Sequence, residues 1–152
     1  MIRYGLLAIA AAASVQVAQS GPPADLSELV AKAGVQGTLA TWCSGDVRLR
    51  GHMGYAAAVM SSNRGGRYLV YEAGETVVEL ATFNGAPEVA CYTSAEARKI
   101  NESIRRSETI SGKVAPMFET TVVCGFVEDT TAMCWQYSPK TRAFIKVGEW
   151  QT

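Results

Sequence analysis

The chain has 152 residues, of which 14 are basic, 14 are acidic and one is a histidine, so its formal net charge at pH 7 is zero. This balance argues against a polyanionic partner such as nucleic acid and against an anionic membrane surface. The single histidine, His52, excludes sites that need several imidazoles.

The first twenty residues have the features of an export signal. Arg3 provides a positive start, and an apolar run extends from Gly5 to Ala13. Ala18 and Ser20 are small residues at the two positions that a signal peptidase reads, which predicts a cut after Ser20. The apolar run is shorter than the roughly 20 residues that span a bilayer. We therefore expect residues 1–20 to be a signal peptide and residues 21–152 to form one periplasmic or extracellular domain, with no stable membrane insertion after cleavage.

The next part of the chain predicts one short helix and several strands. Asp25 has the character of an N-cap, with Glu28 three residues later, and Gly34 can end the helix after about two turns. Strand-like segments follow over 35–43, 55–60, 67–72, 76–83 and 88–92. Asn84-Gly85 predicts a hairpin turn between the last two of these strands.

A longer helix is expected over 94–108. Thr93 and Glu96 form a capping-box pattern at its start, and Ala97, Ile100 and Ile104 form a single narrow apolar stripe. The other faces of this segment are charged, which is typical of a helix that lies on the surface of a sheet.

The last third of the chain, 120–150, predicts three antiparallel strands that are rich in β-branched and aromatic residues. Together these segments predict an α+β domain, in which an antiparallel, curved sheet of about seven or eight short strands packs against one main α-helix, with a short N-terminal helix. Apolar residues on both faces of the last three strands leave open whether the sheet is strongly curved or covered by a second layer.

The even number of cysteines in an exported chain indicates disulfide bonds. The four residues are Cys43, Cys91, Cys124 and Cys134. Their wide spacing lacks the close ligand pairs of a structural zinc site, so we expect no metal and no other cofactor. Three pairings are possible.

Side-chain alternation bears on one of these pairings. A direct bridge across the hairpin between Cys124 and Cys134 requires an odd-numbered loop. A four-residue loop over 128–131 would instead pair Val127 with Ala132, gather the apolar side chains on one face and turn Cys134 to the other. This pattern favours long-range bridges.

The sequence carries no strong catalytic motif, and we expect a non-enzymatic binding or interaction module of the cell envelope that recognises a protein or a small ligand. The candidate surface combines the glycine-rich segment 44–54 with the turn 61–66. Its polar groups would be Arg48, Arg50, His52, Arg64 and Arg67. Loops of this composition often carry binding residues.

Two alternatives are retained. A small envelope hydrolase could use His52 or the carboxylates Glu72, Glu79 and Glu88, which lie on neighbouring predicted strands, because paired acids can cut glycosidic bonds. A structural component of the envelope would need no site at all.

Overall fold

A computed structural model gives the arrangement of the chain and describes residues 21–62, 64–106, 121–127 and 131–151. The predicted signal peptide, residues 1–20, lies outside this description. The elements are α1 (Ala24–Ala33), β1 (Thr38–Gly45), β2 (Gly54–Met60), β3 (Gly65–Tyr71), β4 (Val78–Asn84), β5 (Pro87–Tyr92), α2 (Ser94–Arg106), β6 (Val122–Val127), β7 (Thr131–Ser138) and β8 (Ala143–Gln151).

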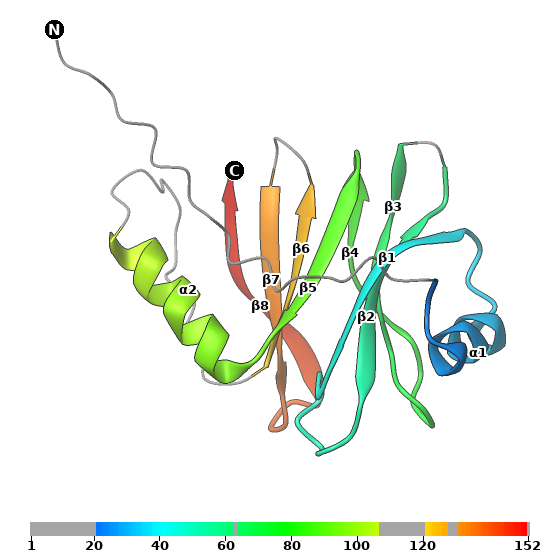
Figure 1. Ribbon diagram of the computed structural model, residues 1–152, viewed down its shortest axis with the longest axis horizontal. Helices are drawn as coiled ribbons and strands as arrows, with labels where there is room; N and C mark the ends of the chain where they lie inside the picture. The colour runs from blue at the N-terminus through cyan, green and yellow to red at the C-terminus, as the bar shows by residue number, and fades with distance from the viewer. Residues whose placement is uncertain (1–20, 63, 107–120, 128–130, 152) are drawn as a thin grey trace, which may run out of the picture.

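The described strands form two antiparallel sheets, and each sheet is a meander of four. One sheet has the order β1-β2-β3-β4 and the other has the order β5-β6-β7-β8 (Figure 1). The predicted fold class is therefore wrong: the sheets cover each other, and neither depends on one main helix. The helices lie on opposite outer sides of the pair.

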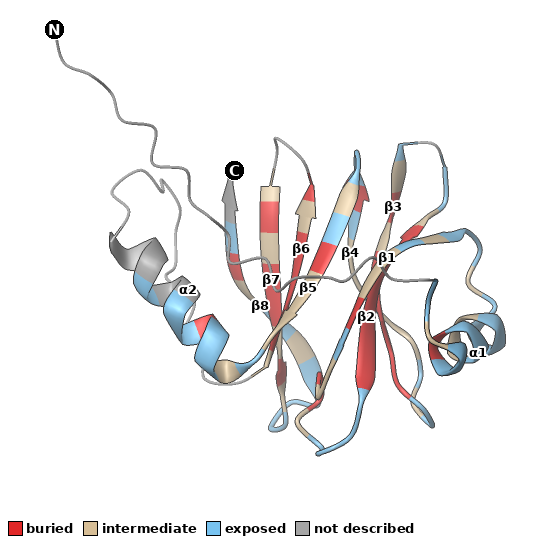
Figure 2. Ribbon diagram, viewed as in Figure 1, coloured by how far each residue is buried: buried red, intermediate tan, exposed pale blue. Residues whose placement is uncertain are grey.

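Three apolar clusters explain this arrangement of layers. Tyr68, Val70 and Trp135 belong to the cluster between the sheets. A second cluster joins Leu26 of α1 to the outer face of β2 and β3, and a third joins Ala97 of α2 to the outer face of β6 and β7. Central strands are therefore buried on both faces (Figure 2), as β2 and β3 are along most of their length. The side chains of Ile100 and Ile104 lie outside the described part of α2.

Tyr68 connects the two sheets at a point of close approach. Its hydroxyl group donates a hydrogen bond of 2.7 Å to the carbonyl oxygen of Phe126 in the opposite sheet. Its ring lies over Gly125, where an added Cβ atom would be 2.6 Å from the ring. Glycine at this position lets the ring and the strand meet.

The disulfides pair Cys43 with Cys91 and Cys124 with Cys134. The first is a long-range bridge and joins β1 of one sheet to β5 of the other. The second contradicts the expectation against a hairpin clip. Val127 pairs with Thr131, so the loop has three residues and brings Cys124 opposite Cys134. The alternation argument fails because both faces of β6 are buried, and a single apolar face therefore does not set the register.

Of the two N-terminal helix caps predicted from the sequence, one is confirmed and the other is wrong. The capping box at α2 is confirmed: the Thr93 backbone N–H donates to Glu96 at 2.9 Å, and the Glu96 N–H donates to the Thr93 hydroxyl at 3.3 Å. The N-cap of α1 is Pro23 and not Asp25. The Asp25 carboxylate instead accepts a hydrogen bond from the Tyr55 hydroxyl and fastens α1 to β2.

The predicted Asn84-Gly85 hairpin is also wrong. The strands before and after it, β4 and β5, belong to different sheets, so this turn connects one sheet to the other.

Three connections lie together at one end of the pair of sheets (Figure 1): 46–53 between β1 and β2, 72–77 between β3 and β4, and 139–142 between β7 and β8. We call this the loop end.

Candidate functional site

The connection 46–53 is held in a defined shape by its own first residue. Two backbone N–H groups, those of Arg50 and Gly51, donate to the Asp46 carboxylate at 2.8 Å each. Leu49 and Gly51 have positive φ angles of 58° and 77°, so the chain turns sharply here. Residues 50–53 are left exposed at the tip.

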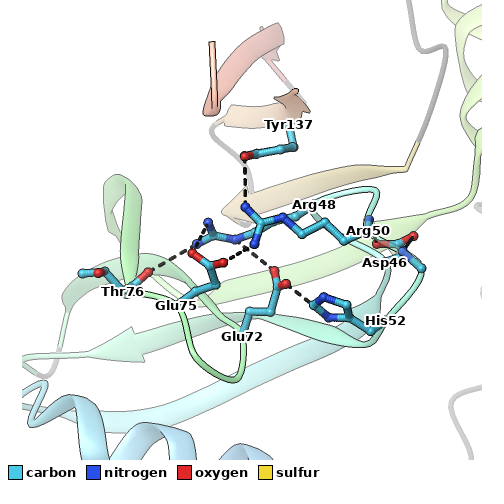
Figure 3. Close-up of polar contacts among 9 residues, drawn as sticks. Asp46, Arg48, Arg50, His52, Glu72, Glu75, Thr76 and Tyr137 are labelled. Atoms are coloured by element: carbon cyan, nitrogen blue, oxygen red, sulfur yellow. Dashed lines mark hydrogen bonds and ion pairs between the residues drawn. The ribbon is translucent and has the colours of Figure 1, made fainter. Parts of the chain in front are cut away.

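Arg48 forms the buried base of this connection. Its side chain is 7% exposed, and its Nε atom lies 2.9 Å from a carboxylate oxygen of Glu72, which is 2% exposed. The other end of the guanidinium contacts Glu75 at 3.3 Å and donates to the Thr76 carbonyl oxygen at 3.3 Å. Figure 3 shows these contacts around the guanidinium. A buried charge needs such partners, since an unpaired one is costly.

Aromatic rings of the opposite sheet complete the environment of Arg48. The centre of its guanidinium lies 5.8 Å from the ring centroids of both Tyr137 and Phe144. These distances are within the range of cation–π contact. Arg48 therefore joins its own connection to the turn between β3 and β4 and to the strands β7 and β8.

The exposed members of the site are also paired. Arg50 forms an ion pair with Glu75 and donates to the Tyr137 hydroxyl at 3.5 Å. The bond from Arg50 lowers the pKa of the Glu75 carboxyl, and the same bond raises the pKa of Arg50. His52, which is about half exposed, places Nδ1 3.2 Å from the second oxygen of Glu72.

Glu72 depends on these charges more than on hydrogen bonds. Its two carboxylate oxygens are buried, and neither accepts a well-aligned hydrogen bond from the residues that the structure describes. The 2.9 Å approach of Arg48 is thus an ion pair with poor hydrogen-bond alignment. The carboxylate is stabilised mainly by the neighbouring guanidinium, and by His52 when the imidazole is protonated.

The structure brings together three of the five residues predicted for the site. Arg48, Arg50 and His52 lie at the loop end. Arg64 and Arg67 lie toward the opposite end of β2, where Arg67 approaches Glu79 at 3.5 Å. The predicted patch is therefore divided between two ends of the molecule.

Sequence reasoning missed the roles of Glu75 and Tyr137, and considered Glu72 only as a possible catalytic acid. The available signal for Glu72 was its place directly after the apolar strand β3, which is buried along most of its length. Glu79 is in β4 beside Arg67, and Glu88 is exposed in β5 of the other sheet. The three carboxylates are thus distributed over different surroundings.

A shallow groove of about 310 Å³ lies between the edge strand β4 and the strands β7 and β8. Its lining combines apolar side chains with two charged ones, Glu79 and Lys146. Within the described ranges, no group of three or more histidine, cysteine or acidic residues could hold a metal ion. No described helix is both long and apolar enough to cross a bilayer.

Comparisons with known proteins identify no relative of this chain. No protein-family model, no curated protein and no solved structure matches the chain. The fold and the loop end therefore carry the functional argument.

Proposed function

We propose that the protein is an exported, non-enzymatic binding module that holds a protein partner at the loop end. Two disulfide bonds are compatible with an oxidising compartment. The predicted signal peptide supports export from the cytoplasm, and sequencing the N-terminus of the native protein would test it.

The binding proposal depends on one observation: the exposed tip of the connection 46–53 is held in place by the paired side chains of Asp46 and Arg48. Met53 is 57% exposed, which makes it the more exposed of the two large hydrophobic residues at the described surface. The chain beneath it is fixed by Asp46 and by the Arg48 ion pairs. A loop that is already ordered loses little conformational entropy on binding, and methionine is enriched at interfaces.

Affinity capture with matched variants tests the proposal. The immobilised domain would be incubated with an extract of the cells that produce it, and bound proteins quantified by mass spectrometry. Met53→Asp should abolish recovery of a specific partner. Ile145→Asp is the control, because Ile145 is the other exposed large hydrophobic residue, at 46%, and lies on β8.

Equal recovery by both variants would contradict the assignment of the loop end. Recovery that is lost only with Met53→Asp, while both variants keep the wild-type melting temperature, would support it. The control separates a local contact from a general effect of removing apolar surface.

A hydrolase is the second candidate, and the contact between His52 and Glu72 favours it. A carboxylate at Nδ1 orients the imidazole and leaves Nε2 to accept a proton from water. Turnover of cell-wall or peptide substrates by the wild-type protein but not by His52→Ala would support this activity. Identical rates for the two proteins would exclude a role for His52.

A further inference from the structure

We infer that the partner presents an acidic protein surface, with carboxylates that face the cations of the loop end and an apolar residue that meets Met53. This inference rests on the proposed function and adds the chemical class of the partner. The inference depends on the charge that remains at the loop end once the internal ion pairs are counted.

Most of the charges at the base neutralise one another. Arg48 is paired with Glu72 and Glu75, and Arg50 is paired with Glu75. The Asp46 carboxylate is occupied by two backbone N–H groups. Two arginines against three carboxylates leave one formal negative charge, on Asp46, whose oxygens accept hydrogen bonds from the backbone of its own loop.

The cations that remain are on the neighbouring turn between β7 and β8. Lys140 and Arg142 are both exposed, and neither forms an ion pair with any residue that the structure describes. The contacts of Arg50 with Tyr137 and of Arg48 with Phe144 place this turn beside the connection 46–53 (Figure 1).

The acidic residues of the three connections that define the loop end are Asp46, Glu72 and Glu75, and none of them is classed as exposed. Glu72 is buried, and Glu75 is 30% exposed but already contacts both arginines. Arg48, Arg50, Lys140 and Arg142 against these three carboxylates give the connections a formal net charge of +1 (four minus three), and Lys140 and Arg142 are its exposed cations that form no ion pair with a described residue. Complementary charge on a partner would steer its approach and select against basic proteins.

The exposed side chain of Met53 indicates that the partner is a protein and not another kind of polyanion. Met53 is largely exposed and lies in the same connection as the exposed Arg50, so cationic and flexible apolar side chains share one surface. A sulfated polysaccharide would use the cations but would gain little from the methionine. A protein interface uses both kinds of contact.

Charge reversal with a matched control tests the inference. The probe is poly-L-glutamate, with heparin as the competing class of polyanion, and binding is measured at two salt concentrations. The test variant is Lys140→Glu/Arg142→Glu. The control is Arg98→Glu/Lys99→Glu on α2, which reverses one arginine and one lysine that are both exposed and so changes the net charge equally.

We expect poly-L-glutamate binding to weaken about tenfold in the loop-end variant and to change less than about twofold in the α2 variant. Wild-type binding should also weaken as salt rises. Equal losses in the two variants would show an effect of net charge alone and would overturn the inference. Tighter binding of heparin, unaffected by Met53→Ser, would assign the surface to a polysaccharide.

The experiments can disprove the acidic class of the partner without disproving the binding function of the loop end. If Met53→Asp abolishes partner capture but Lys140→Glu/Arg142→Glu leaves it unchanged, the loop end is a binding surface and the acidic class is wrong. If neither variant affects capture, the proposed function fails as well.

Discussion

Arg48 is the residue that ties the connection 46–53 to the rest of the protein. Its guanidinium is buried between Glu72 and Glu75, in the connection that joins two strands of the first sheet, and the rings of Tyr137 and Phe144 in the second sheet. A single substitution here therefore affects the loop, a neighbouring turn and the contact between sheets together.

Replacement of Arg48 by methionine keeps much of the side-chain volume but removes the charge. We expect Arg48→Met to lower the free energy of unfolding by about 3–5 kcal/mol, because Glu72 is left buried without its main cation. Urea denaturation would measure the loss. Arg48→Met/Glu72→Leu should recover a large part of it, and a double variant no more stable than Arg48→Met would contradict the explanation.

Gly125 allows a second test with a single substitution, here of the contact between the sheets, because the ring of Tyr68 occupies the space that a side chain at this position would need. Gly125→Ala should cost about 1–3 kcal/mol through overpacking of the contact between the sheets. Gly45→Ala is the matched control. There the new Cβ would meet its nearest atoms at 3.7 Å, an ordinary contact distance. Similar stabilities for the two variants in thermal unfolding would show that the sheets can separate locally at little cost.

Among the elements, α1 depends on a polar contact as well as on its apolar face. Leu26 is fully buried against the outer face of the first sheet, and Asp25 accepts the hydrogen bond from Tyr55. That bond lowers the pKa of Asp25. Burial, and then the same bond, raise the pKa of Tyr55 to about 12.

These two shifts predict opposite pH limits for the docking of α1. Because the folded pKa of Asp25 is lowered, its contribution is present above its unfolded value of 3.8 and is lost as pH falls through the folded value. The folded pKa of Tyr55 is raised, so its contribution is full below pH 10 and is lost as pH rises toward 12. Asp25→Asn should remove part of the acid loss in pH-dependent unfolding, and Tyr55→Phe part of the alkaline loss. Curves that parallel the wild type would refute the coupling.

The predictability of the elements follows from how local their signals are. The capping box of α2 involves residues only three apart, so Thr93 and Glu96 predict it correctly. Side-chain alternation does not predict the register of β6 and β7, because it assumes one buried face, whereas Cys124 and Val123 are buried on opposite faces of the same strand. Asn84-Gly85 predicts a turn, but the dipeptide does not encode which sheet the next strand joins.

For the whole molecule, the two-sheet arrangement and the loop end arise from contacts between distant residues. The pairing of Arg48 with Glu72 and Glu75 has no local spacing rule, so the loop composition indicated a site in 44–54 but could not indicate that Arg48 is buried. The same limit applies to Arg64 and Arg67, which are close in sequence to this segment but lie toward the other end of β2.

The two disulfides should contribute unequally to stability. The Cys43–Cys91 bridge closes a segment with a separation of 48 residues, and Cys124–Cys134 closes one of 10. On the loop-entropy relation these lengths correspond to about 4 and about 3 kcal/mol. Replacement of Cys43 and Cys91 by alanine should therefore lower the melting temperature more than replacement of the other pair. The reverse order in calorimetry would show that the link between sheets is dispensable.

The loop end as a protein-binding surface is tested most directly by photo-crosslinking. A photoreactive amino acid would replace Met53 in one version of the protein and Ile145 in another, and each would be irradiated in an extract of the producing cells. We predict that the version labelled at Met53 gives a covalent adduct with one acidic protein, and that the version labelled at Ile145 does not. The same adducts from both positions, or none from Met53, would contradict the proposed function.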